Sequence, residues 1–426
     1  MMTLTTLTTW GWKAGWQYGL MGLPLAFCAL PLYILLPNWY ARSYGMPLAT
    51  VGWVMLAARL LDALLDPFIG RWIDRLYRAS ATHVLKLCAF AALSMAAGFY
   101  FLFFPLITDM AYLPWYLGGV LVVTYTAFSV VMVAHQAWGA LLGGGAVVRS
   151  QIVAWREGFS LAGVMLAAVL PELLGLGAMT VFVGFALSAG WLAWTQCRRP
   201  ASVQRWTTPG HQLSLARPWQ VHPFRRLLAV FMLNGIASSL PATLVLFFIQ
   251  DRLQAPSTLQ ALALAVYFGA AALSIPLWVQ SVRLWGLARS WLMGMCAAVL
   301  VFASAFPLGA GDAGTFLWIS ALSGIALGSD LVIPTAMLAG VVATAGDQGH
   351  AEATYFGWWN LVSKLNLALA AGLALPLLAY LGYAPGTRDP QALQALSLAY
   401  CLVPCALKAL ALVFLYLFFI RMPSKP

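Results

Sequence analysis

Three ionisable side chains interrupt an otherwise apolar stretch of the chain: Arg59, Asp62 and Asp66. Their spacing of three and four residues places all three on one face of a helix. A charged side chain at the centre of a bilayer costs about 2.5–3.5 kcal/mol on insertion scales, so these groups require partners. Two carboxylates one turn apart can chelate Na⁺, or can share a proton because both cannot readily ionise in a low dielectric. The pattern predicts a cation path.

Two basic residues are candidate charge partners for these acids. Arg59 lies beside them, and Lys364 lies within an apolar stretch of the second half of the chain. Both would neutralise the site when the transported cation leaves, and this exchange of charges would couple cation release to the transport cycle. The alternative is a static salt-bridge network that pins the second span to the eleventh.

The composition predicts a polytopic membrane protein. The chain has 426 residues, of which 62% are hydrophobic and 8% are charged, whereas soluble chains average about 25% charged residues. At about 20 residues per span, this length accommodates roughly twelve membrane helices. The net charge of +11 is explained by basic loops, so we do not expect nucleic-acid binding.

The hydropathy pattern divides the chain into two sets of six spans. The apolar stretches lie near residues 16–41, 48–73, 84–105, 113–141, 152–171, 177–196, 226–249, 258–282, 289–308, 315–342, 353–381 and 393–420. A long basic loop separates the two sets. We therefore predict an all-α integral membrane protein with a six-helix bundle over 1–197, a central loop over 198–225 and a second six-helix bundle over 226–426. Such paired bundles are typical of carriers that bind solute near the membrane midplane.

The distribution of Lys and Arg predicts the orientation. If the N-terminus is cytoplasmic, most basic loop residues fall on the cytoplasmic side, and Arg42, Arg252 and Arg388 fall on the other. We expect a multi-pass protein of the cell (inner) membrane with both termini cytoplasmic. Sequence patterns for a P-loop, a zinc protease or a serine esterase are absent from the chain. We therefore expect neither an enzyme nor a cofactor.

A second group of residues is predicted to form gates. Asp74 and Arg75 follow Gly70 at the cytoplasmic end of the second span, where they could cap helices and pair across a loop. Arg149 and Arg156 lie at the inner ends of the fourth and fifth spans, where gating salt bridges are favoured over substrate binding.

The candidate substrate contacts are polar or aromatic residues expected near the midplane or a central cavity. They are His135, Gln136, Trp138, Asn234, Trp358, Trp359 and Asn360. For the tryptophans, packing or interfacial anchoring is the alternative interpretation. Asp330 in the tenth span either lines the cavity or pairs with a neighbouring base.

These residues resemble a known family. The relevant patterns are Arg59-x-x-Asp62-x-x-x-Asp66-Pro67 with Gly70, and Tyr355-Phe356-Gly357-Trp358-Trp359-Asn360 leading to Lys364 and Gly382-Tyr383. They resemble the glycoside–pentoside–hexuronide:cation symporters of the major facilitator superfamily. The resemblance implies that Asp62 and Asp66 form the cation site and that Lys364 lies close to it. We expect no metal beyond a transported Na⁺ at Asp62 and Asp66.

The chain departs from this family at three positions. Ala26 and Ala134 occupy positions where family members carry sugar-binding acids, and Val131 occupies the position of a hydroxyl near the cation site. The galactoside-type anchors are therefore expected to be absent. Fewer oxygen ligands favour H⁺ over Na⁺, because a hard cation needs several oxygens around it.

Together these patterns predict cation-coupled symport, by H⁺ or Na⁺, of a small polar solute such as a sugar or glycoside. An efflux antiporter, a lysolipid carrier of the same fold and a non-transporting membrane sensor are the alternatives. The expected partners are the solute, the cation and the lipid bilayer, and we expect a monomer.

Overall fold

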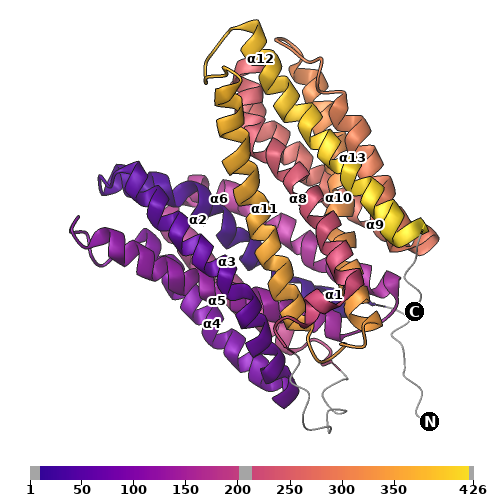
Figure 1. Cartoon of the computed structure of the whole chain (residues 1–426). Helices are drawn as coiled ribbons and strands as arrows, with labels where there is room; N and C mark the ends of the chain where they lie inside the picture. The colour runs from indigo at the N-terminus through magenta and orange to yellow at the C-terminus, as the bar shows by residue number, and fades with distance from the viewer. Residues whose placement is uncertain (1–9, 201–213, 422–426) are drawn as a thin grey trace. The chain divides into compact units, whose positions relative to one another are not determined.

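The computed structural model describes residues 10–200 and 214–421, and the regular elements in these ranges are helices (Figure 1). The chain forms two compact units. The first comprises Met1–Pro218 with Val342–Leu361, and the second comprises Trp219–Val341 with Val362–Pro426. Residues 201–213 of the predicted central loop lie outside the described residues.

The first unit is built from the N-terminal helices. They are α1 (Trp12–Gly19), α2 (Gly22–Ser43), α3 (Leu48–Ala79), α4 (Ala81–Phe103), α5 (Leu113–Leu141) and α6 (Ala146–Thr195). Helix α5 packs against α3 and α4, while α6 packs against α1, α2 and α4. The connection from α3 to α4 is a single residue, Ser80, whose Oγ accepts a hydrogen bond of 3.1 Å from the Thr82 amide and so caps α4.

The second unit is built mostly from later helices. They are α8 (His222–Phe247), η2 (Phe248–Arg252), α9 (Ser257–Ala303), α10 (Ala313–Thr344), α12 (Pro390–Ser397), η3 (Leu398–Leu402), α13 (Val403–Leu415) and η4 (Tyr416–Arg421). The short α7 (Arg217–Gln220) precedes them. Helix α11 (Glu352–Tyr380) contributes its first turns to the first unit and the remainder to the second.

Two long helices each contain two spans. Helix α6 has 50 residues and is interrupted at Gly175 (φ 79°), and α9 has 47 residues and is interrupted at Gly286 (φ 78°). A positive φ is readily adopted only by glycine, so these residues divide each helix into two passes.

The described helices account for the twelve predicted spans. Eight are long and apolar enough to cross a membrane, and the interruptions in α6 and α9 make two of these double. The segments Trp12–Tyr33 and Leu35–Ser43, which contain α1 and α2, meet the same criteria as one span bent by 42°. Helix α11, with 29 residues, is long enough to cross a hydrocarbon core of about 30 Å.

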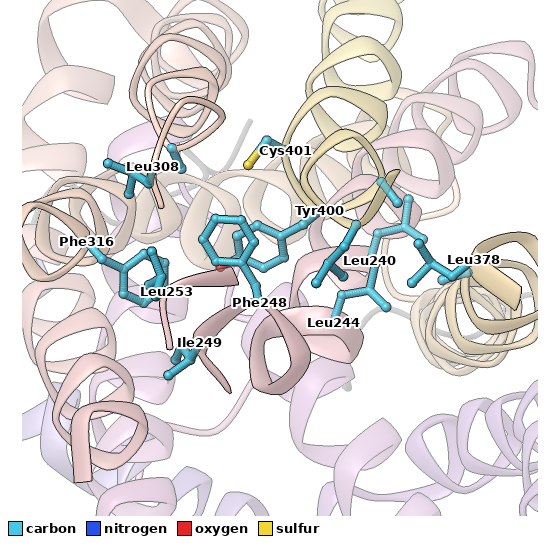
Figure 2. Close-up of a cluster of buried hydrophobic side chains, with 14 of the residues drawn as sticks. Leu240, Leu244, Phe248, Ile249, Leu253, Leu308, Phe316, Leu378, Tyr400 and Cys401 are labelled. Atoms are coloured by element: carbon cyan, nitrogen blue, oxygen red, sulfur yellow. The ribbon is translucent and has the colours of Figure 1, made fainter. Parts of the chain in front are cut away.

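The second unit has an apolar core at its π-helical segments (Figure 2). The ring of Phe248 in η2 stacks on Tyr400 in η3, with ring centroids 4.2 Å apart and an interplanar angle of 16°. Asp251 of η2 accepts hydrogen bonds from the Tyr383 hydroxyl and, at 3.0 Å, from the Gly386 amide. The loop that follows α11 is thereby tied to η2.

Candidate functional site

The two acids of α3 are buried. Asp62 is 6% exposed and Asp66 is 0% exposed. Ser129 of α5 donates a hydrogen bond of 2.7 Å from its Oγ to Oδ1 of Asp62. The prediction that the fourth span brings no hydroxyl to these acids was therefore wrong. It rested on Val131, whereas the packing of α5 on α3 turns Ser129 towards Asp62.

The described contacts of Arg59 are to tyrosines. Its Nε lies 3.5 Å from the Tyr125 hydroxyl, and its Cζ lies 4.6 Å from the centre of the Tyr33 ring and 5.9 Å from that of Tyr125. Aromatic faces attract a guanidinium electrostatically, by about 0.5–1 kcal/mol or more when desolvated. Arg59 is thus held on the same face of α3 as the acids, and its part in charge neutralisation stays a prediction. Lys364 lies on α11 within the second unit.

Asp74 caps the start of α11. Its Oδ1 accepts a hydrogen bond of 2.8 Å from the Ala353 amide. Its Oδ2 accepts two more, at 2.8 Å from the Thr354 amide and at 2.6 Å from the Thr354 hydroxyl. The first amides of a helix have no partner within the helix and carry partial positive charge. A carboxylate from another helix therefore satisfies them and holds the first turn of α11 against α3.

Two glycines allow α3 and α11 to cross at close range. A Cβ on Gly70 would lie 2.1 Å from the Ala353 carbonyl oxygen, and a Cβ on Gly357 would lie 2.4 Å from the Asp66 carbonyl oxygen. Small residues at such crossings let membrane helices pack backbone to backbone. We name the residues Asp66, Gly70, Asp74, Ala353, Thr354 and Gly357 the α3–α11 contact.

Two predicted substrate residues bond to each other. Asn360 of α11 donates a hydrogen bond of 2.9 Å from Nδ2 to Oε1 of Gln136 on α5. They are 3% and 6% exposed, respectively. This amide pair links α5 to the same part of α11 that meets α3.

We expect Gln136 and Asn360 to be energetically coupled. Removing one partner leaves the other buried without its hydrogen bond, at a cost of about 1–3 kcal/mol. Gln136→Leu and Asn360→Leu should each lower the stability of the purified protein, and the double variant should lose less than the sum. A thermal or denaturant unfolding series measures this coupling, and strict additivity would show that the pair contributes nothing.

His135 and Trp138 are packed into an aromatic cluster of the first unit. The His135 ring stacks on Tyr18 at 4.2 Å, and its Nε2 lies 2.8 Å from the Tyr18 carbonyl oxygen. Trp138 packs edge-to-face on Trp194 and donates from Nε1 to the Arg198 carbonyl oxygen at 3.2 Å. Both side chains are 0% exposed. This arrangement favours the packing interpretation, and their contact with substrate stays a prediction.

The remaining candidates are distributed over both units. Trp358 is half-buried and donates from Nε1 to the Leu215 carbonyl oxygen at 3.0 Å. Trp359 is 3% exposed in the first unit, and Asn234 is 3% exposed on α8 in the second. Their roles at a substrate site stay predictions.

The loop between α10 and α11 is held by an acid that sequence reasoning did not assign to a site. Asp347 accepts hydrogen bonds from Arg217 Nε at 3.0 and 3.2 Å and from the Tyr355 hydroxyl at 2.6 Å. The hydrogen bond with Asp347 raises the pKa of the Arg217 guanidinium. One feature of the sequence could have pointed to Asp347. Its loop lies on the expected cytoplasmic side but carries an acid and no Lys or Arg.

The other predicted gating residues differ in their surroundings. Arg156 is 8% exposed and pairs with its neighbour Glu157, with Nη2 at 2.5 Å from Oε1. Arg75 is exposed. The Nε of Arg149 is buried and has no hydrogen-bond partner among the described residues. Their gating roles stay predictions.

Asp330 pairs with a base, as one of the two sequence interpretations had it. Lys408 Nζ of α13 lies 2.6 Å from Oδ2 of Asp330 on α10. Trp291 of α9 donates to Asp330 Oδ1 at 2.8 Å, and Lys408 also donates to Ser238 Oγ of α8 at 3.2 Å. Each ion of this largely buried pair keeps a second partner, as a pair inside a membrane requires.

Solved transporter structures share this fold. A bacterial homologue of the iron transporter ferroportin, in an outward-facing state, has TM-score 0.68 and 17% identity, covering 93% of this chain and 99% of that chain. The human organic anion transporter MFSD10 (TETRAN) has TM-score 0.66 and 18% identity, covering 95% of this chain and 100% of that chain. The E. coli fucose:proton symporter has TM-score 0.68 and 13% identity, covering 96% and 98%. At such identities the likeness shows the fold alone.

Sequence comparison gives the family. No curated protein matches the chain, but the family model described as MFS/sugar transport protein matches residues 16–421. The predicted resemblance and the predicted fold are both confirmed. The chain is a multi-pass membrane protein that belongs to the MFS/sugar transport protein family, the glycoside–pentoside–hexuronide type of the major facilitator superfamily.

Proposed function

We propose that this protein is a symporter that couples the entry of a small polar solute to H⁺ or Na⁺. The observation that carries the proposal is the burial of Asp62 and Asp66 on one face of α3 in a transporter of this family. Buried carboxylates inside a membrane span are costly, and they mark ion or proton paths in transporters.

The surroundings of Asp62 support cation binding. The Ser129 hydroxyl that donates to Asp62 can also turn its oxygen towards a bound ion, since a hydroxyl both donates and accepts. The two carboxylates and this hydroxyl supply oxygen ligands for Na⁺, and either carboxylate alone accepts a proton. Ser129 therefore weakens the sequence argument for H⁺ over Na⁺.

The α3–α11 contact supports a gate at one end of the cation site. Gly357 packs on the backbone of Asp66, so withdrawal of the first turns of α11 would uncover the backbone next to this acid. The positive-inside rule assigns this end to the cytoplasm, together with both termini. In the proposed cycle the contact opens after cation and solute have bound, and Arg59 and Lys364 balance the acids once the cation has left.

Gradient-driven uptake into proteoliposomes tests the proposal. Purified protein is reconstituted, and sugars, glycosides, organic acids and lysolipids are screened under an imposed H⁺ or Na⁺ gradient. We expect one hydroxylated solute to accumulate above its external concentration with one of the two gradients. Solute expulsion under the same gradient would assign antiport, and lysolipid movement alone would assign a lipid carrier.

We expect Ser129→Ala to weaken cation binding without blocking transport. Loss of the hydrogen bond to Asp62 should raise the cation concentration for half-maximal uptake by roughly tenfold, the equivalent of one charge-assisted bond. Thr124→Val is the matched control, because the Thr124 hydroxyl on the same helix bonds to its own backbone at Val120. Equal cation dependence in the two variants would remove Ser129 from the site.

A further inference from the structure

Two buried amide oxygens of the second unit have no hydrogen-bond donor among the described residues. They are Oδ1 of Asn234 on α8 and Oδ1 of Asn366 on α11. Each side chain is only 3% exposed. Buried polar atoms in native proteins are nearly always paired, so two such atoms on neighbouring helices need an explanation.

The two asparagines occupy adjoining positions. A Cβ on Gly235, the residue after Asn234, would lie 2.0 Å from Nδ2 of Asn366. The side chain of Asn366 therefore rests on the backbone of α8 next to Asn234. Both residues lie near the middle of their helices, which is the depth at which carriers of this kind bind solute.

The polar environment extends along α8 from these residues. Ser238 lies one turn beyond Asn234, on the same helix face. It accepts the hydrogen bond from Lys408, which pairs with Asp330. The Asp330–Lys408 pair has no net charge, and the two amide oxygens are themselves neutral acceptors.

We propose that Asn234 and Asn366 form a solute-binding site that accepts hydrogen bonds from the hydroxyl groups of a neutral, sugar-like solute. The inference rests on the proposed function in one respect, that the chain carries a small polar solute. Two uncharged acceptors match hydroxyl donors, because a neutral hydroxyl leaves no bare charge when it is buried. A site of this kind discriminates strongly against an analogue that lacks the hydroxyl, since the amide oxygen is then left unpaired.

The proposal predicts opposite effects on stability and on binding. Leucine is close to asparagine in shape and needs no hydrogen bond, so Asn234→Leu and Asn366→Leu should raise the melting temperature of the solute-free protein. The same variants should bind the solute more weakly, by roughly tenfold each. Asn360→Leu is the matched control: its amide already bonds to Gln136, so this variant should melt at a lower temperature.

The experiment combines thermal unfolding with equilibrium binding on the purified full chain. The probes are galactose, glucose, their deoxy analogues and a set of disaccharides, without any ion gradient. Higher melting temperatures together with weaker sugar binding support the site. The proposal would be overturned by any of three results. The variants could melt at a lower temperature, as Asn360→Leu should, or both could keep the sugar affinity of the unaltered protein. The third is that the unaltered protein binds no sugar. Binding at equilibrium does not depend on cation coupling, so failure of the symport proposal would be seen separately.

Discussion

Asparagine in place of Asp66 is expected to abolish concentrative solute uptake while the protein remains folded in the membrane. The side chain is fully buried, and asparagine keeps its shape but cannot bind a cation by charge or take up a proton. Without an exchangeable charge, the cation gradient has no group through which to drive the solute. The accumulation ratio in proteoliposomes under an imposed gradient should fall to about one, the value at equilibrium.

Two further observations make this prediction specific. Exchange of labelled solute across the membrane at equal concentrations should persist, because asparagine mimics the neutralised site. Asp109→Asn is the control: this acid lies in an exposed loop of the same unit and caps the turn at Ala111. If Asp66→Asn accumulates solute as well as Asp109→Asn does, Asp66 does not belong to the cation site.

Valine in place of Gly70 is expected to break the α3–α11 contact. Its Cβ would lie 2.1 Å from the Ala353 carbonyl oxygen, so the two backbones must separate. Overpacking of this kind costs about 1–3 kcal/mol, and separation also weakens the Asp74 cap on α11. We expect faster hydrogen exchange across 347–361, a lower melting temperature and severely reduced transport.

The same helix supplies the control for this experiment. Gly52 also lies on α3, and a Cβ there would meet nothing within 4 Å, so Gly52→Val changes helix propensity without a collision. Hydrogen exchange measured by mass spectrometry compares the two variants. Equal protection of 347–361 in both would mean that the close crossing at Gly70 does not hold α11.

The fold was largely predictable from hydropathy, and the differences have local causes. The stretch predicted over 48–73 continues as a helix to Ala79. The last turns of this helix are charged, so a hydropathy plot does not detect them. They are held by tertiary contacts, because Tyr77 bonds to Ala134 and Asp74 bonds to Ala353. Hydropathy predicted two separate spans in each of the regions that form α6 and α9. In the structure each region is one long helix, interrupted only at Gly175 in α6 and at Gly286 in α9.

The candidate site was predictable in part. The spacing of Asp62 and Asp66 correctly predicted that they share a helix, yet the Ser129 hydroxyl was missed because only helix packing determines which face of α5 meets α3. The Gln136–Asn360 bond joins residues far apart in sequence, and no local pattern reports it. The burial of His135 between Tyr18 and Trp194 likewise depends on partners from α1 and α6.

The central claim is that cation and solute cross the membrane together, and co-transport of the two tests it most directly. Proteoliposomes without an imposed gradient receive an inward solute gradient, and entry of H⁺ or Na⁺ is recorded with a pH electrode or a sodium tracer. We predict that solute entry carries one of these cations inward in the unaltered protein and not in Asp66→Asn. Solute entry by the unaltered protein with no movement of either cation would contradict the account.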